Sequence, residues 1–113
     1  MKNGKRYNPY LMFVGSFIPN WILCRKEIHS NAKLVFARLA QFAGPDGRCY
    51  PKRSTLACEC GMSKRTVDRA IAQLKQFKLI EVERQGFDKP NRYFFIEHEW
   101  MSDPKYWRKD HDV

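Results

Sequence analysis

Residues 57–74 read ACECGMSKRTVDRAIAQL, and this stretch decides the fold. Gly61 can end a short helix, because glycine readily adopts the left-handed backbone found at helix C-termini. Ser63 can then cap the next helix with its hydroxyl. That helix places four apolar residues on one face, at the i, i+3, i+4, i+7 spacing: Val67, Ala70, Ile71 and Leu74. Two helices joined by so short a turn must cross steeply, so the pattern predicts a helix-turn-helix.

A helical period also precedes this stretch. It starts at Ser30, where Ser30 or Asn31 can cap the helix, and the sequence GPDG at residues 44–47 ends it. The expected inward face comprises Leu34, Val35, Leu39 and Phe42. The sequence RCY at residues 48–50 is a candidate minor strand, and Pro51 is expected to open the helix that Gly61 closes.

Strand patterns follow the helix-turn-helix. Residues 79–85 alternate between apolar and charged side chains, and residues 93–97 supply a second strand. Between them, GFDKPN at residues 86–91 has the residue types of a hairpin loop. The expected fold class is therefore mainly α with a small antiparallel β-hairpin, a winged helix-turn-helix in which three helices pack on the hairpin.

The length of 113 residues suits one domain with one core. We divide residues 1–113 into an N-terminal arm (1–29), a winged-helix core (30–97) and a C-terminal tail (98–113). In the arm, the sequence predicts a short strand at residues 13–18, followed by docking of Trp21, Ile22 and Leu23 on the core.

The charge points to a polyanionic partner. The chain carries 21 Lys and Arg against 12 Asp and Glu, a net charge of +9. Residues 48–78 hold eight cations and two anions, so six of these nine charges lie in the predicted helix-turn-helix. No apolar run approaches the ~18 residues that span a bilayer, and no export signal is evident. We therefore predict a cytoplasmic protein with reduced cysteines and no membrane partner.

The cysteines do not predict a metal site. On a helix, Cys58 and Cys60 lie about 200° apart, so they cannot converge on one ion. Cys60 shares the buried face with Leu56, whereas Cys58 points outward. Zinc would also require Cys24 or Cys49 and a ligand such as His29, and a nucleophilic thiol would require a histidine brought near by the fold. We predict no metal, no cofactor and no catalytic residue, and hence a protein that is not an enzyme.

The outward face of the helix that Ser63 caps carries side chains that can read DNA bases. Arginine can bind guanine and glutamine can bind adenine in the major groove, which admits a helix. The alternative, an ordinary solvent-facing surface, predicts acids as well. Asp68 is the only acid between Ser63 and Phe77, and it is expected to pair with Lys64 or Lys75. The candidate base contacts are Arg65, Thr66, Arg69, Gln73 and Gln76.

Other polar residues are candidate contacts to DNA phosphates. Cations at a helix N-terminus oppose the helix dipole, so an anion is expected beside them. In the hairpin loop, cations either touch DNA or only keep the turn soluble. The aromatic run at residues 93–95 could stack on bases, but strand alternation favours core packing. The candidate backbone contacts are Lys52, Arg53, Ser54, Ser63, Lys64, Lys75, Lys89 and Arg92.

The chain also resembles a known family over about residues 17–84. The resemblance lies in a Pro-Asn-Trp start, Ala-Lys-Leu, Gly-x-Cys-Tyr-Pro, Leu-Ala, Gly-x-Ser-x-x-Thr-Val and Leu-Ile, in that order. This pattern is similar to the winged helix-turn-helix domains of plasmid and phage replication proteins and related small regulators. The resemblance implies that the helix at residues 64–77 enters the major groove of double-stranded DNA.

Two residues depart from the family pattern. Lys52 stands where such domains usually have serine, and Lys78 stands where they usually have glycine. If Lys78 adopts a left-handed backbone, the strain is roughly 1–2 kcal/mol.

Four kinds of function remain open. The family most often initiates plasmid or phage replication, but some members regulate transcription, and a winged helix can also serve as a protein-interaction module in a replication complex. Binding of single-stranded DNA or RNA is a further alternative. The arm and the tail are candidate surfaces for a homodimer or for a replication protein partner.

Overall fold

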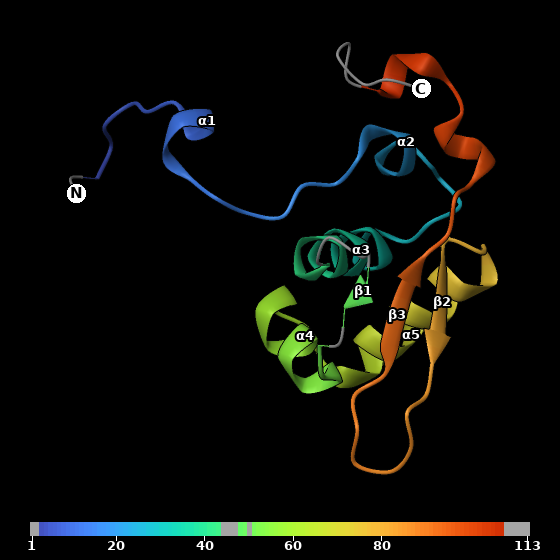
Figure 1. Cartoon of the computed structure of the whole chain (residues 1–113). Coiled ribbons are helices and arrows are strands. Elements are labelled where there is room, and N and C mark those ends of the chain that lie inside the picture. Colours follow the sequence, from blue (N-terminus) through green and yellow to red (C-terminus); the bar gives the residue numbers. More distant parts are fainter. Residues whose placement is uncertain (1–2, 44–47, 50, 108–113) are drawn as a thin grey trace.

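Three helices and a small sheet form the body of the molecule (Figure 1). The computed structural model describes residues 3–43, 48–49 and 51–107. The helices are α3 (Ser30–Phe42), α4 (Arg53–Cys60) and α5 (Lys64–Gln76). The strands are β1 (Arg48–Cys49), β2 (Ile80–Glu83) and β3 (Arg92–Phe95). The predicted winged helix-turn-helix fold class is confirmed.

The turn between α4 and α5 forms as the sequence predicts. Gly61 has a φ of 65°, and the N–H of Met62 donates to the carbonyl of Ala57 over 2.9 Å. Ser63 Oγ accepts from the N–H of Thr66 over 3.1 Å, which caps α5. The predicted apolar face of α5 is buried. Pro51 does not open α4, because the helix begins at Arg53, and its N-cap residue Lys52 makes no side-chain capping bond.

Helix α3 differs from the prediction at its start and in its inward face. His29, not Ser30 or Asn31, caps it, because His29 Nδ1 accepts from the N–H of Asn31 over 3.1 Å. Leu34 and Phe42 are 45% and 36% exposed. The core side of α3 is rotated relative to the predicted face and consists of Ala32, Val35, Phe36, Ala37 and Leu39.

The sheet has three antiparallel strands in the order β1-β3-β2. The candidate strand at RCY thus forms at Arg48–Cys49, and Arg48 lies opposite Phe94 of β3. The predicted GPDG helix end lies outside the described residues. Tyr93 in the central strand is fully buried, and Phe95 meets Phe36 edge to face at 5.5 Å between ring centroids. These rings pack in the core, as strand alternation favours.

Lys78 adopts the left-handed backbone, with φ of 61°. Its N–H donates to the carbonyl of Lys75, and the N–H of Leu79 donates to the carbonyl of Leu74, each over 3.0 Å. This pair of bonds is the Schellman motif, in which glycine is the usual left-handed residue. The chain therefore turns from α5 into β2 through a lysine at a position that favours glycine.

Lys78→Gly is expected to raise the free energy of unfolding by up to about 1 kcal/mol. The substitution relieves roughly 1–2 kcal/mol of left-handed strain but adds entropy to the unfolded chain. Urea unfolding at constant pH measures the difference. Lys75→Gly, in the last turn of α5, is the matched control and should lower stability by about 1 kcal/mol. A lower urea midpoint for Lys78→Gly would contradict the strain argument.

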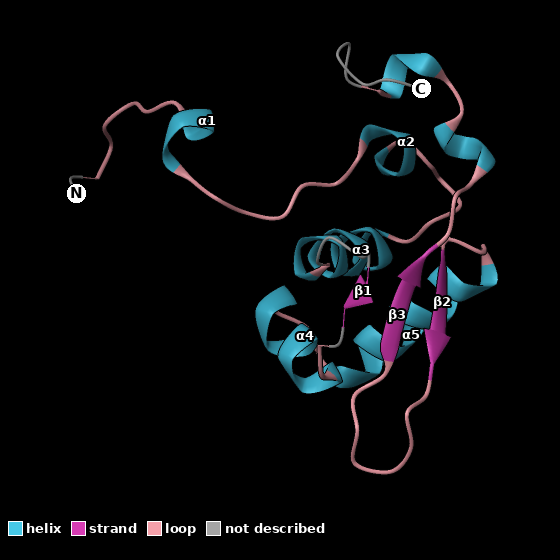
Figure 2. Cartoon of the chain, viewed as in Figure 1, coloured by secondary structure: helices cyan, strands magenta, loops and turns pink. Residues whose placement is uncertain are grey.

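The N-terminal arm does not contain the predicted strand. Among its described residues, the regular elements are the one-turn helices α1 (Pro9–Met12) and α2 (Asn20–Leu23), and residues 13–18 are loop (Figure 2). The hydroxyl of Ser16 donates to Gln41 of α3 over 2.6 Å. Residues 13–18 are not part of the described sheet, whose strands are β1, β3 and β2.

The end of the arm and the start of the tail pack on the body. Trp21 and Ile22 are buried as predicted, whereas Leu23 is 48% exposed. The tail forms short 3₁₀ turns at η1 (Glu99–Met101) and η2 (Pro104–Tyr106). His98 Nδ1 accepts from the N–H of Trp100, so Nε2 carries the proton and donates to the carbonyl of Phe77 over 3.1 Å. No helix in the described part of the chain has the length and apolarity to cross a membrane.

Candidate nucleic-acid interface

Helix α5 presents two polar strips to solvent. One strip carries the exposed side chains of Arg65, Arg69 and Gln76. The other faces the hairpin and includes Lys64, Asp68, Ala72 and Lys75. The two strips lie side by side on the surface of α5, so one ligand can contact both.

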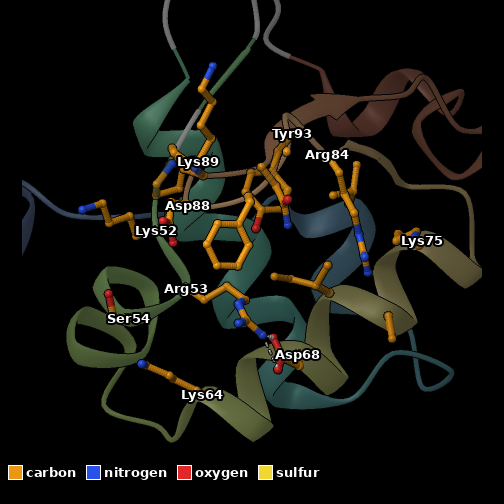
Figure 3. Close-up of a pocket in the computed structure, with 18 residues that line it drawn as sticks. Lys52, Arg53, Ser54, Lys64, Asp68, Lys75, Arg84, Asp88, Lys89 and Tyr93 are labelled. Carbon is orange, nitrogen blue, oxygen red and sulfur yellow. Dashed lines mark hydrogen bonds and ion pairs between the residues drawn. The ribbon is translucent and has the colours of Figure 1, made fainter.

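A cleft of about 1040 Å³ lies between the second strip, the start of α4 and the loop joining β2 to β3, which we call the wing (residues 84–91) (Figure 3). Six cations and two acids are among the residues that line it. The net charge of these side chains is therefore +4. The cations are Lys52, Arg53, Lys64, Lys75, Arg84 and Lys89, and the acids are Asp68 and Asp88.

Arg53 and Asp68 form an ion pair across the cleft. Arg53 Nη1 donates to both carboxylate oxygens of Asp68, over 2.9 and 2.8 Å (Figure 3). The side chains are 54% and 46% exposed. The hydrogen bond to Asp68 raises the pKa of Arg53. The predicted pairing of Asp68 with Lys64 or Lys75 is therefore wrong, because the fold brings the first residue of α4 to Asp68 instead.

Gln73, a predicted base contact, has both ends of its side-chain amide hydrogen-bonded within the fold. Its Oε1 accepts from the N–H of His29 over 2.8 Å, and its Nε2 donates to the carbonyl of Glu27 over 3.1 Å. Both ends of the amide are thus bonded to the backbone that leads into α3. Gln73 ties α5 to this segment, and base reading would break two hydrogen bonds.

The first turn of α5 holds two further predicted residues. Ser63 Oγ and Thr66 Oγ1 lie 3.0 Å apart, and Ser63 Oγ also caps the helix. Thr66 is half-buried, whereas Ser63 is exposed. The two hydroxyl groups are therefore hydrogen-bonded to each other in the first turn of α5, next to the exposed side chains of Lys64 and Arg65.

The wing extends beyond the body at the end away from the tail (Figure 1). Gly86 and Asp88 have φ angles of 118° and 64°, and Phe87 between them is 93% exposed. Lys89 is exposed beside them, and its contact with the DNA backbone stays a prediction. Arg92 instead lies in β3 at the wing's base, where Nη1 is 3.5 Å from Glu83 Oε1.

Arg84 and Asn91 line the cleft but are absent from the predicted contacts. Both flank the strands at the two ends of the wing, and Arg84 directly follows β2. Arg84 lies in the predicted strand at residues 79–85 and Asn91 in the predicted loop at residues 86–91, and these positions were the signal available in the sequence. The structure adds that Arg84 and Asn91, where the wing joins the strands, line the same cleft as α5.

The cysteines have the predicted orientations. Cys58 is exposed and Cys60 is half-buried against the core, where burial raises the pKa of its thiol. In the described ranges, no three His, Cys, Asp or Glu residues gather closely enough to hold a metal ion. Cys60 is thus best described as a packing residue of the helix-turn-helix.

Comparison with known proteins agrees with the fold. Residues 26–80 match the model of a helix-turn-helix domain family. No curated protein matches the chain. A solved structure of a Rep–DNA complex aligns with a TM-score of 0.57 and 17% identity, covering 74% of this chain and 75% of that one. The N-terminal domain of a DNA-binding protein aligns with the same score and identity, covering 82% and 84%. At this identity, the two structures show a shared fold.

Proposed function

We propose that this chain, which carries a winged helix-turn-helix domain of the DNA-binding type, binds double-stranded DNA in a sequence-specific manner. The carrying observation is the cationic cleft of about 1040 Å³ between α5 and the wing. A helix can enter the major groove while a wing follows the adjacent backbone or minor groove. The cleft lies between the two elements that such docking would use.

Base reading is assigned to the first strip of α5. Arg65 and Arg69 are one helical turn apart and exposed, and Gln76 extends the strip toward the helix end. Arginine suits guanine and glutamine suits adenine. Thr66 joins them at the first turn, where its methyl group can contact thymine. Gln73 is assigned to the fold instead, because its amide is already bonded.

Phosphate binding is assigned to polar residues that line the cleft or lie near it. Lysine ammonium groups and helix-start N–H groups bind phosphates without reading sequence. Arg53 would offer its Nη1 to a phosphate only by leaving Asp68. The proposed contacts are Lys52, Arg53, Ser54, Ser63, Lys64, Lys75, Arg84, Lys89 and Arg92.

Titration of duplex DNA across a range of salt concentrations tests this mechanism. If about five phosphates are neutralised, the slope of log K against log salt should be near −4 to −5. Fluorescence anisotropy with labelled duplexes measures it, and single-stranded probes of the same sequence are the control. A slope near zero, or tighter binding to the single strands, would contradict the proposal.

The biological setting that we propose is initiation of plasmid or phage replication. One of the two structural neighbours is a Rep protein bound to DNA, and its fold matches this chain. Selection of bound duplexes from a random pool would reveal the target and its symmetry. An array of direct repeats is expected at an origin, whereas a single inverted repeat over a promoter would favour transcriptional regulation instead.

We also propose that the arm joins two copies of the chain. Tyr10, Leu11, Val14 and Phe17 are 70–97% exposed, unlike the closed core of the body. The tail offers a second cleft of about 520 Å³, lined mainly by aromatic and apolar residues together with Glu97. Lys5 and Arg6 precede the apolar part of the arm, so the charges of the arm and this cleft are complementary. Equilibrium sedimentation should give a dimer for residues 1–113 and a monomer for residues 18–113.

A further inference from the structure

We propose that the Arg53–Asp68 ion pair is a gate that lowers affinity for non-specific DNA. The pair stays closed on a random duplex and opens on the target, where Arg53 passes from Asp68 to a phosphate. This inference rests on the proposed DNA binding. It assigns to Asp68 a role in specificity.

The position of the pair places it in the path of the DNA backbone. Arg53 is the first residue of α4, and Asp68 lies on the strip of α5 that faces the wing. Both line the cationic cleft, and Arg53 points toward Asp68 within it (Figure 3). A phosphate entering the cleft therefore meets a guanidinium that is already bonded to a carboxylate.

The chemistry of the pair makes it exchangeable. Both carboxylate oxygens bond to one nitrogen, Arg53 Nη1, so the guanidinium keeps donors for a second acceptor. Both side chains are about half exposed, and exposed ion pairs are weak. A phosphate can bind a guanidinium with two parallel hydrogen bonds, so it competes well with Asp68.

Breaking the Arg53–Asp68 ion pair costs free energy, and this cost depends on how deeply α5 lies in the major groove. Asp68 is the only acid in α5, and once Arg53 leaves, its carboxylate faces the DNA alone. In a seated complex, an amino group of cytosine in the major groove can donate to that carboxylate. A loosely bound random duplex supplies no such donor. The pair therefore opens at the target and remains closed elsewhere.

Asp68→Asn tests the gate, because asparagine keeps the shape and removes the charge that holds Arg53. On random duplexes, affinity should rise about fivefold, and the log-log salt slope should steepen by about 0.9 as Arg53 gains a phosphate. On the selected target, affinity should change less than about twofold, so the ratio of specific to non-specific affinity falls. Thermal unfolding should verify that the variants remain folded.

Glu81→Gln is the matched control. Glu81 is exposed on β2, next to Val82, which lines the cleft, so strand alternation points Glu81 to the opposite face. Glu81→Gln also removes one negative charge, but it leaves the Arg53–Asp68 ion pair unchanged. Equal effects of the two variants would show that only net charge matters and would overturn the proposal. So would a loss of target affinity alone in Asp68→Asn, because Asp68 would then be a simple base reader.

The double variant Arg53→Gln with Asp68→Asn identifies the extra phosphate contact. It should return the slope on random duplexes to the wild-type value. If the steeper slope persists, another cation is responsible and the gate is wrong. Failure of the proposed function would look different, because the wild-type chain would then bind no duplex at all.

Discussion

Replacing Arg65 and Arg69 together by alanine is expected to weaken binding to the target at least about thirtyfold. Each arginine that makes two hydrogen bonds to a guanine contributes about 1–3 kcal/mol of discrimination against other bases. A difference of about 1.4 kcal/mol corresponds to tenfold in affinity. Both side chains are exposed on α5, so their removal leaves the core intact. Binding to random duplexes should fall much less, since phosphate contacts dominate there. Competition titrations with target and random duplexes measure both values.

A double lysine variant is the matched control for this experiment. Lys26, in the loop before α3, and Lys105, in the tail, are exposed, and neither lines the cationic cleft. Lys26→Ala with Lys105→Ala removes the same two charges. If this variant weakens target binding as much as the arginine variant does, α5 does not read bases. Domain docking to a protein partner would then become the better explanation of the exposed arginines.

Ile22→Ala is expected to lower the free energy of unfolding by about 2–5 kcal/mol. Ile22 is fully buried in the core although it lies in the N-terminal arm, and removal of buried methyl groups leaves a cavity. A domain of this size has about 5–15 kcal/mol of stability in total, so the loss should be obvious in a urea titration. The result would show that the end of the arm belongs to the folding unit.

The neighbouring residue supplies the control for Ile22. Leu23 is 48% exposed, so Leu23→Ala should cost about 1 kcal/mol or less. The two variants remove similar side chains from adjacent positions of one helical turn. Equal losses would contradict the observed burial, and negligible losses in both would mean that the fold does not need α2.

Local features of the fold were predictable because neighbouring residues determine them. Gly61 and Ser63 end and start helices through bonds that reach only three to five residues along the chain. Lys78 occupies the left-handed position that the family pattern marks with glycine. The apolar spacing of α5 likewise predicts its buried face, since the 3.6-residue period alone decides which side chains share it.

Contacts between distant residues were not predictable in the same way. The prediction placed Gln73 on the base-reading face, but its partners are 44 and 46 residues away, before α3. It assigned Asp68 to lysines on the same helix, although Arg53 of α4 reaches it. The prediction of a strand at residues 13–18 was also wrong, because a strand forms only beside another strand and the local sequence pattern does not indicate whether one is near.

The amino-acid sequence by itself determined the helix-turn-helix, the order of the elements and the basic character of the segment around α5, because short-range periodicity and capping encode them. Only the tertiary structure decided which exposed side chains are free to meet a ligand. Hydrogen bonds and ion pairs form between whichever groups the fold brings within about 3 Å, and that proximity depends on the packing of the whole chain. The ion pair of Asp68 with Arg53 and the two side-chain hydrogen bonds of Gln73 are examples.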